Sequence, residues 1–157
     1  MIKLNEPAPD FTLPCNNTGD NSDDITLSAL RPAPVVLFFY PKDDTPGCTI
    51  ETIDFTSLKP EFDALGARVF GLSKDSIAKH AKFRSKHELT VSLLSDADGH
   101  TCEDYGVWGE KTNFGKKYMG IERTTVLIDA TGHVARVWNK VKVQDHAAEV
   151  LEAVRAL

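Results

Sequence analysis

Cysteine is scarce in this 157-residue sequence, which contains Cys15, Cys48 and Cys102 and no others. Three scattered cysteines are too few for a disulfide scaffold. No two of them form a CxxC pair, which excludes a redox dithiol of that type and leaves a zinc ribbon without ligands. An odd number of cysteines without a secretory leader is typical of a reducing compartment, so we expect the protein in the cytoplasm.

Long apolar runs and clustered basic residues are also missing. The longest apolar stretch, residues 35–40, is far shorter than the roughly 20 residues that span a bilayer, so we expect no membrane segment. The net charge of -5, from 23 acidic and 18 basic residues, argues against a nucleic-acid partner. The best basic cluster, Lys111 with Lys116 and Lys117, is short and indicates a solvated loop.

The residues that are present support one folded domain. Hydrophobic residues make up 41% of the chain and charged residues 26%, which is enough for a core and for a polar surface. We find no repeat, low-complexity tract or linker, so residues 1–157 are predicted to form a single domain. His80 and His87 are interpreted as surface histidines, and no metal site is expected.

The pattern of apolar residues predicts the helices and strands. Residues 11–13 and 25–27 flank a polar loop, which predicts an N-terminal hairpin. Residues 35–40 are continuously apolar, as expected of a strand covered on both faces. Helical spacing follows from Ile50 to Leu65, where Pro60 should kink or divide the helix. The later predictions are strands at 69–72 and 91–94, helices at 77–87 (capped by Ser73 or Asp75) and 102–105, a hairpin at 124–138 and a last helix after Asp145.

Strands that alternate with helices favour a mostly parallel central sheet flanked by helices. The first hairpin is an N-terminal extension of this sheet, and the later hairpin adds antiparallel strands at an edge. This is the plan of a thioredoxin-like α/β fold.

The segment from residue 40 to residue 51 is the candidate site, because it joins the most buried strand to the first turn of a helix. Cys48 lies at or just inside the helix N-terminus, where unpaired N–H groups and the helix dipole favour the thiolate, which is the nucleophile. Thr45 can point at the same place, Pro41 stiffens the loop, and Gly47 lets the backbone approach a small substrate closely. Taken alone, a cysteine in a helix is more often a small buried hydrophobe.

Pro41, Thr45 and Cys48 match the signature of the peroxiredoxins, a proline, a threonine four residues later and a cysteine three residues after that. The fuller run 40–51 resembles the bacterioferritin comigratory protein (PrxQ-type) class of that family. The resemblance extends over almost the whole chain, through residues 54–55, 95–96 with 99, 105–108, 120–125 and 141–143, to the terminal helix.

The resemblance implies a thiol-dependent peroxidase that reduces hydrogen peroxide and small organic hydroperoxides. The Cys48 thiolate would attack one peroxide oxygen and become a sulfenic acid. Thr45 would hold the peroxide, while N–H groups at Gly47 and Cys48 stabilise the departing oxygen. Arg123, which matches the family arginine, would bring a positive charge to the sulfur. Glu51 is either a polar support of this site or a surface acid favoured by the helix dipole. The class implies no metal, haem or flavin cofactor, and a monomer.

Many members of the class carry a second, resolving cysteine, and here the sequence departs from them. Ile53 occupies one usual position, and residues 77–87, which hold the other, contain no cysteine. We therefore expect a one-Cys mechanism, in which thioredoxin, glutaredoxin or a small thiol reduces the sulfenic acid. The alternative is a two-Cys mechanism with Cys102, or less favourably Cys15, as the resolving residue after local unfolding.

Two other classes of function stay open. A non-catalytic redox-sensing domain would use oxidation of Cys48 as a signal, but sensing alone does not require Pro41, Thr45 and Arg123 together. A general dithiol–disulfide oxidoreductase is disfavoured because no CxxC pair is present.

Overall fold

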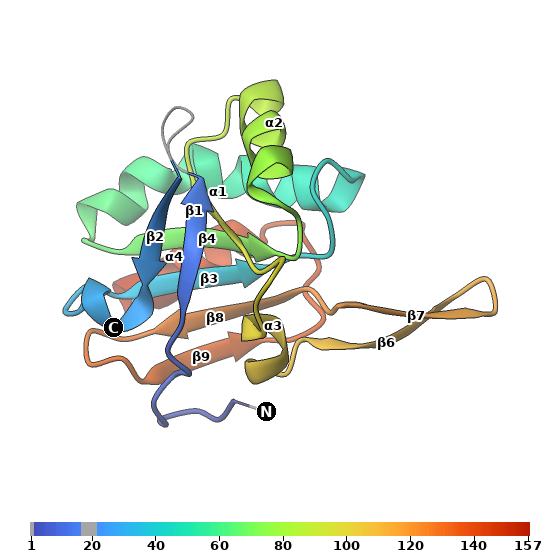
Figure 1. The fold of residues 1–157 in the computed structure, drawn as a ribbon. Helices are drawn as coiled ribbons and strands as arrows, with labels where there is room; N and C mark the ends of the chain where they lie inside the picture. Colours follow the sequence, from blue (N-terminus) through green and yellow to red (C-terminus); the bar gives the residue numbers. More distant parts are fainter. Residues whose placement is uncertain (1, 17–21) are drawn as a thin grey trace.

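The computed structural model describes residues 2–16 and 22–157 (Figure 1). The elements in chain order are β1 (Thr12–Asn16), β2 (Ser22–Thr26), the 3-10 helix η1 (Leu27–Leu30), β3 (Val35–Phe39), α1 (Pro46–Ala64), β4 (Arg68–Ser73), α2 (Ile77–His87), β5 (Ser92–Ser95), α3 (Thr101–Asp104), β6 (Trp108–Asn113), β7 (Lys116–Ile121), β8 (Thr124–Ile128), β9 (Val134–Trp138) and α4 (His146–Arg155). The predicted hairpins formed by β1 with β2 and by β8 with β9 are confirmed.

Seven strands form the central sheet, in the order β2-β1-β5-β4-β3-β8-β9. The pairs β3–β4 and β4–β5 are parallel, and the other four pairs are antiparallel. The thioredoxin-like α/β class is confirmed, but the sheet is mixed rather than mostly parallel. The reason is that helical crossovers, which parallel pairs require, occur in this sheet only at β3-α1-β4 and β4-α2-β5, whereas hairpins at both edges add antiparallel strands.

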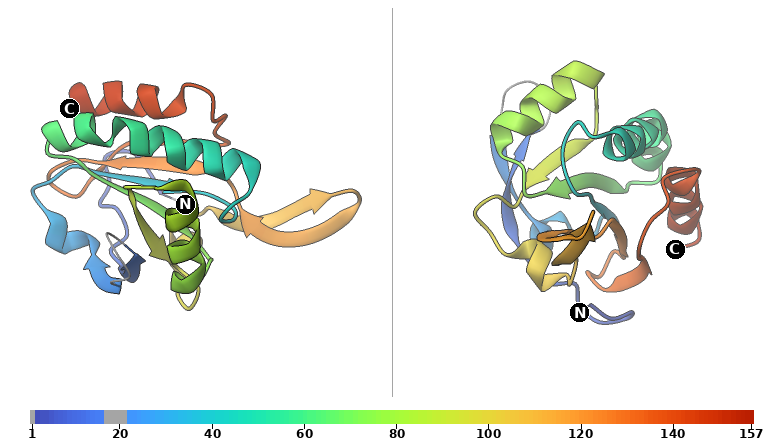
Figure 2. Two further views of the ribbon diagram at one scale, coloured as in Figure 1. Left: turned by 90° about the horizontal axis from the view of Figure 1, so that it is seen from above. Right: turned by 90° about the vertical axis from the view of Figure 1, so that its right-hand side faces the viewer.

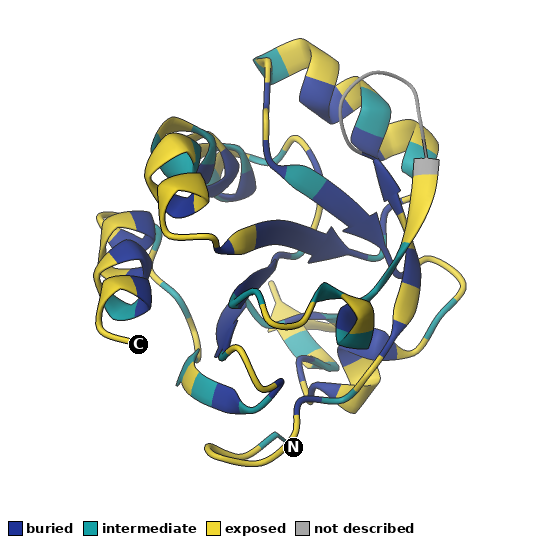
Figure 3. Cartoon of the chain, turned by 90° about the vertical axis from the view of Figure 1, so that its left-hand side faces the viewer, coloured by how far each residue is buried: buried dark blue, intermediate teal, exposed yellow. Residues whose placement is uncertain are grey.

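Two hydrophobic clusters cover the two faces of this sheet. Helices α1, α2 and α4 pack on one face, and α3, η1 and the N-terminal segment pack on the other (Figure 2). Strand β3 serves both, because Val36 and Phe38 face the first cluster while Leu37 and Phe39 face the second. All five of its residues are buried, as the continuous apolar run predicts (Figure 3). Full burial of each such side chain contributes roughly 1.5–3 kcal/mol, which fixes the strand that leads into the candidate site.

Helix α1 runs through Pro60 as one helix, so of the two predicted effects, a kink or a division, the division is wrong. Proline removes one helical hydrogen bond and destabilises a helix interior by about 3 kcal/mol. Phe55 and Phe62, which lie on either side of Pro60, are both fully buried in the same cluster and hold the two halves in one helix. The predicted caps of α2 are also wrong, because the cap is Ser76, whose hydroxyl accepts from the N–H of Lys79 at 3.3 Å.

Strands β6 and β7 form a separate two-stranded arm that projects from the body of the protein (Figures 1 and 2). The sequence prediction of a solvated loop around Lys111, Lys116 and Lys117 missed it. The arm buries little of either face, and Phe114 at its tip is 97% exposed. A strand without a buried face needs no alternation of apolar and polar residues, and that alternation is the signal by which a strand is predicted. None of the helices within residues 2–16 and 22–157 is long and apolar enough to span a bilayer.

Candidate active site

Cys48 is the third residue of α1, which begins at Pro46 with Thr45 as its N-cap. Proline suits the first helical position because its fixed backbone angle is helical and its missing N–H is not needed there. The first N–H to bond back into the turn is that of Thr49, which donates to the carbonyl of Thr45 at 2.9 Å. The N–H groups of Gly47 and Cys48 therefore precede the helical hydrogen bonds and face the end of the helix, where they favour an anion.

Arg123 brings a positive charge to the sulfur from a different part of the chain. Its Nη2 donates to Sγ of Cys48 at 3.3 Å, and its Nη1 donates to Oε1 of Glu51 at 2.8 Å. It directly precedes β8, and its carbonyl accepts from the N–H of Val141 at 3.0 Å, which fixes its backbone. A guanidinium held this close to the sulfur is placed to stabilise negative charge on the reacting atoms, including a departing oxygen.

Gly47 makes room for this guanidinium. A Cβ atom at residue 47 would lie 3.1 Å from Nη2 of Arg123, which is too tight for the present arrangement. The sequence prediction assigned Gly47 to a close approach of the substrate. The structure adds that the absence of a side chain also lets Arg123 reach the sulfur.

Glu51 is buried, with 1% of its side chain exposed, so the interpretation as a surface acid is wrong. Its Oε1 pairs with Arg123, while Oε2 has no hydrogen-bond partner among the described residues. Burial raises the pKa of this carboxyl from 4.5 to about 7, against the opposing effect of the Arg123 charge. Glu51 therefore fixes the guanidinium and changes its own charge near neutral pH.

Thr45 and Pro41 lie on the loop between β3 and α1. The hydroxyl of Thr45 donates to the carbonyl of Lys42 at 2.9 Å, which leaves its oxygen lone pairs to accept a hydrogen bond. Within the described residues, Thr45 makes no hydrogen bond to Cys48 or Arg123. Both Pro41 and Thr45 are partly exposed, whereas Cys48 is only 1% exposed. Cys48 is thus as buried as a core cysteine. It differs from a core cysteine because a guanidinium contacts its sulfur.

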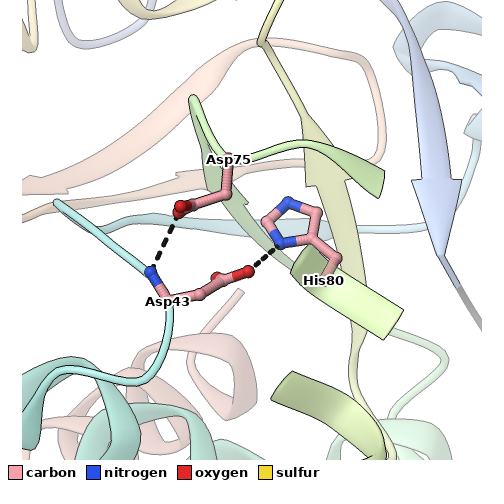
Figure 4. A group of neighbouring side chains, drawn as sticks. All are labelled: Asp43, Asp75 and His80. Atoms are coloured by element: carbon pink, nitrogen blue, oxygen red, sulfur yellow. Dashed lines mark hydrogen bonds and ion pairs between the residues drawn. The ribbon is translucent and has the colours of Figure 1, made fainter. Parts of the chain in front are cut away.

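Asp43 anchors the middle of the same loop (Figure 4). One of its carboxylate oxygens accepts from the Tyr40 hydroxyl at 2.6 Å, and its N–H donates to Asp75 at 2.9 Å. Asp75 in turn accepts from the hydroxyl of Ser73 at 2.6 Å. These bonds tie the loop to the ends of β3 and β4, so the backbone between Pro41 and Thr45 is held in place.

His80 completes this anchor from α2. Its Nδ1 lies 2.6 Å from the second carboxylate oxygen of Asp43, and its Nε2 lies 2.9 Å from the carbonyl of Leu94. Because a carbonyl only accepts, Nε2 donates to Leu94, and Nδ1 faces the carboxylate of Asp43. His80 is fully buried, so its interpretation as a surface histidine is wrong. Ligand atoms of Asp43, Asp75 and His80 lie within 4.8 Å of one another, but the hydrogen bonds just described already satisfy them.

The other two cysteines lie away from the site. Cys15 and Cys102 are fully buried and belong to the cluster on one face of the sheet, whereas Cys48 belongs to the cluster on the opposite face. Burial raises the pKa of Cys15 to about 11, and burial together with the charge of Asp96 raises that of Cys102 well above its ordinary range. All three thiols are free.

The structure thus brings together Cys48, Arg123, Gly47 and Glu51, with Thr45 and Pro41 on the adjoining loop. Sequence reasoning missed the anchor formed by Asp43 and His80. No local pattern marks it, because its members lie 37 residues apart.

Comparisons with known proteins agree with this geometry. Residues 4–137 match the AhpC/TSA family. Peroxiredoxin Bcp from Bacillus subtilis is 46% identical over 98% of this chain and 96% of its own length. Among solved structures, PrxQ from Xylella fastidiosa has a TM-score of 0.91 and 36% identity, covering 99% of this chain and 97% of that one. The bacterioferritin comigratory protein of Xanthomonas campestris, studied for its alkyl peroxide reduction activity, has a TM-score of 0.88 and 40% identity, covering 99% and 98%.

The fold, the motif at the start of α1 and the comparisons all indicate the same protein family. The chain belongs to the AhpC/TSA family, in the bacterioferritin comigratory protein (PrxQ) class of peroxiredoxins, and is a thiol-dependent peroxidase.

Proposed function

We propose that Cys48 is the peroxidatic residue and that Arg123 activates it. The observation that carries this proposal is the 3.3 Å contact between Nη2 of Arg123 and Sγ of Cys48 at the N-terminus of α1. The thiolate attacks one oxygen of the peroxide, the O–O bond breaks, and the sulfur becomes a sulfenic acid while alkoxide or hydroxide departs. The departing oxygen then takes a proton from solvent.

Neighbouring groups orient the peroxide and stabilise the negative charge that develops on it. The Thr45 oxygen accepts a hydrogen bond from the peroxide O–H, because its own proton is already given to the carbonyl of Lys42. The N–H groups of Gly47 and Cys48, together with Arg123, are preorganised donors for the leaving oxygen. Pro41 fixes the loop that carries Thr45. The activity studied in the Xanthomonas relative supports organic hydroperoxides, alongside hydrogen peroxide, as substrates of this chain.

The test is peroxide consumption by the purified protein with a thiol donor. Cys48→Ser should abolish turnover. A Cys15→Ser/Cys102→Ser double variant, which keeps Cys48, is the matched control and should retain it. Turnover that survives in Cys48→Ser would refute the proposal.

We further propose a one-Cys mechanism, in which a thiol from outside the chain reduces the sulfenic acid. Its support is the placement of Cys15 and Cys102 on the opposite side of the sheet, since a disulfide requires Cα atoms within about 7 Å. Mass spectrometry of peroxide-treated protein should find a trapped sulfenic acid at Cys48 and no internal disulfide. A peptide that links Cys48 to Cys102 would favour the two-Cys alternative instead.

The domain organisation, oligomeric state, compartment and electron donor are also proposals. We propose that residues 1–157 form one domain that acts as a monomer in the cytoplasm, with thioredoxin, glutaredoxin or a small thiol as the electron donor. Three free thiols support a reducing compartment. Light scattering at micromolar concentration tests the monomer, and a dimer would contradict it.

A further inference from the structure

A cleft of about 590 Å³ adjoins the candidate active site. It lies between the loop after β3, the start of α2 and the base of the β6–β7 arm, and Pro41 forms part of its wall. The side chains of interest in its lining are Lys42, Lys79, Lys111, Trp108, Tyr118 and Met119. A volume of this size suits a small organic ligand rather than a peroxide alone.

The lysines that line the cleft outnumber the carboxylates that pair with them. Of its four lysines, only Lys74 is paired, with Asp96 at 3.1 Å and Glu103 at 2.7 Å. Among the described residues, Lys42, Lys79 and Lys111 form no ion pair within 4.0 Å, and the lining of the cleft holds one carboxylate, Asp75, against the four lysines. Glu122, outside the lining, interacts electrostatically with Lys111. In a chain of net charge -5, three unpaired lysines around one cleft make a local site that attracts anions.

The cleft is also close to the reacting sulfur. Its lining includes Pro41, four residues before Thr45, and Ile121, two residues before Arg123. In agreement with this placement, burial and the charge of Arg123 lower the pKa of Lys111, and Lys111 interacts electrostatically with Cys48 as well. A backbone hydrogen bond holds the base of the arm beside Arg123. The N–H of Glu122, next to Arg123, donates to the carbonyl of Val107 at 2.8 Å. A ligand held by the lysines would therefore lie beside the site where the sulfenic acid forms.

Apolar groups complete the lining. Tyr118 is 48% exposed and Met119 is 52% exposed, and the ring of Trp108 lies 5.2 Å from Nζ of Lys74. Lysines beside exposed apolar side chains suit a ligand that has carboxylates and a short aliphatic part.

We propose that this cleft binds a small thiol that carries carboxylates, and that this thiol reduces Cys48. The inference rests on the proposed one-Cys function. The thiol attacks the sulfenic sulfur, an S–S bond forms, and water leaves: Cys48–SOH plus RSH gives Cys48–S–S–R plus water. A second RSH then attacks the mixed disulfide, which releases RSSR and restores the Cys48 thiol.

The thiol, rather than the peroxide, is the reactant that needs such a site. A peroxide requires only Thr45 on the loop, Cys48 on α1 and Arg123 before β8, which already lie together. The reductant must be brought from solvent to a sulfur that is 1% exposed, because neither interior cysteine lies in the same cluster. Binding through its carboxylates would place its sulfur for attack and raise its local concentration.

The experiment compares mercaptosuccinate, which has two carboxylates, with neutral 2-mercaptoethanol, at saturating hydrogen peroxide. A Lys42→Gln/Lys79→Gln variant removes two exposed lysines of the cleft. A Lys116→Gln/Lys117→Gln variant removes the same charge from the end of the arm, outside the cleft, and is the control. For mercaptosuccinate, kcat/KM should fall about ten-fold in the cleft variant, or roughly three-fold per lysine, and less than two-fold in the control. For 2-mercaptoethanol it should change less than two-fold in both variants, and added salt should reduce the advantage of mercaptosuccinate.

Three results would overturn the inference and leave the peroxidase intact. The first is an equal loss for both thiols in the cleft variant. The second is a loss confined to a carboxylate-bearing hydroperoxide, measured against tert-butyl hydroperoxide, which would assign the cleft to the oxidant. The third is turnover with thioredoxin but with neither small thiol. If Cys48 is not oxidised by peroxide at all, the proposed function itself fails, and that is measured without any thiol.

Discussion

Replacement of Arg123 by glutamine should slow the reaction of Cys48 with hydrogen peroxide by about two orders of magnitude. At the observed 3.3 Å, two unit charges interact by about 5 kcal/mol with an effective dielectric constant near 20. Arg123 is 17% exposed, and glutamine keeps a neutral donor, so roughly half of this energy should be lost. A loss of about 2.5 kcal/mol corresponds to roughly a 70-fold lower rate.

The complication is Glu51, which would remain buried and lose Arg123, its one hydrogen-bond partner among the described residues. The comparison is therefore made in a Glu51→Gln background, where the neutral amide needs no counterion. Stopped-flow measurement of Cys48 oxidation should show a drop of about 30- to 200-fold between Glu51→Gln and Glu51→Gln/Arg123→Gln. Arg155→Gln, at the exposed end of α4, should have no effect. If the double variant reacts within three-fold of Glu51→Gln, the guanidinium does not activate the sulfur and the reasoning is wrong.

Three further predictions concern the groups around this site. The pKa of Glu51 is raised from 4.5 to about 7 by burial, so the folded state retains a proton that the unfolded state loses. As pH rises from 4.5 to about 7, the Glu51 carboxyl should therefore lower the unfolding free energy by about 3 kcal/mol. Urea titrations at several pH values should show this decline in the unchanged protein and not in Glu51→Gln. Burial lowers the pKa of His146 from 6.5 to about 4, so its contribution to stability should be lost as pH falls through that range, and thermal unfolding of His146→Gln should show a weaker acid dependence. His80→Gln should lower the unfolding free energy by about 3–5 kcal/mol because the buried Asp43 carboxylate loses its ion-pair partner and keeps the Tyr40 hydroxyl as a donor, and Asp43→Asn/His80→Gln should recover part of it. A double variant no more stable than His80→Gln would contradict this account of the anchor.

The sequence predicted the strand β3, the helix that follows it and the position of Cys48 between them, because a continuous apolar run and helical spacing are local signals. Arg123 lies 75 residues from Cys48, and only the family resemblance distinguished it from a surface charge. The burial of His80 was missed because its hydrogen-bond partners, Asp43 and Leu94, come from other elements. A histidine on a helix gives no local sign of such partners.

Other errors arose where packing outweighed local preference. Pro60 does not divide α1, because the buried side chains on both sides of it hold the helix together. The β6–β7 arm was predicted as a loop because it has no buried face. The lysine cleft could not be found either, since Lys42, Lys79 and Lys111 come from a loop, a helix and a strand that meet only in the folded protein.

The most direct test of the account is the second-order rate constant for oxidation of each cysteine by hydrogen peroxide, followed by trapping of the sulfenic acid and peptide mapping. We predict that Cys48 reacts at least about 100-fold faster than free cysteine at the same pH, and that Cys15 and Cys102 stay reduced. A rate no higher than that of free cysteine, or a sulfenic acid at either of the other two positions, would contradict the claim that Arg123 and the α1 N-terminus make Cys48 the reacting sulfur.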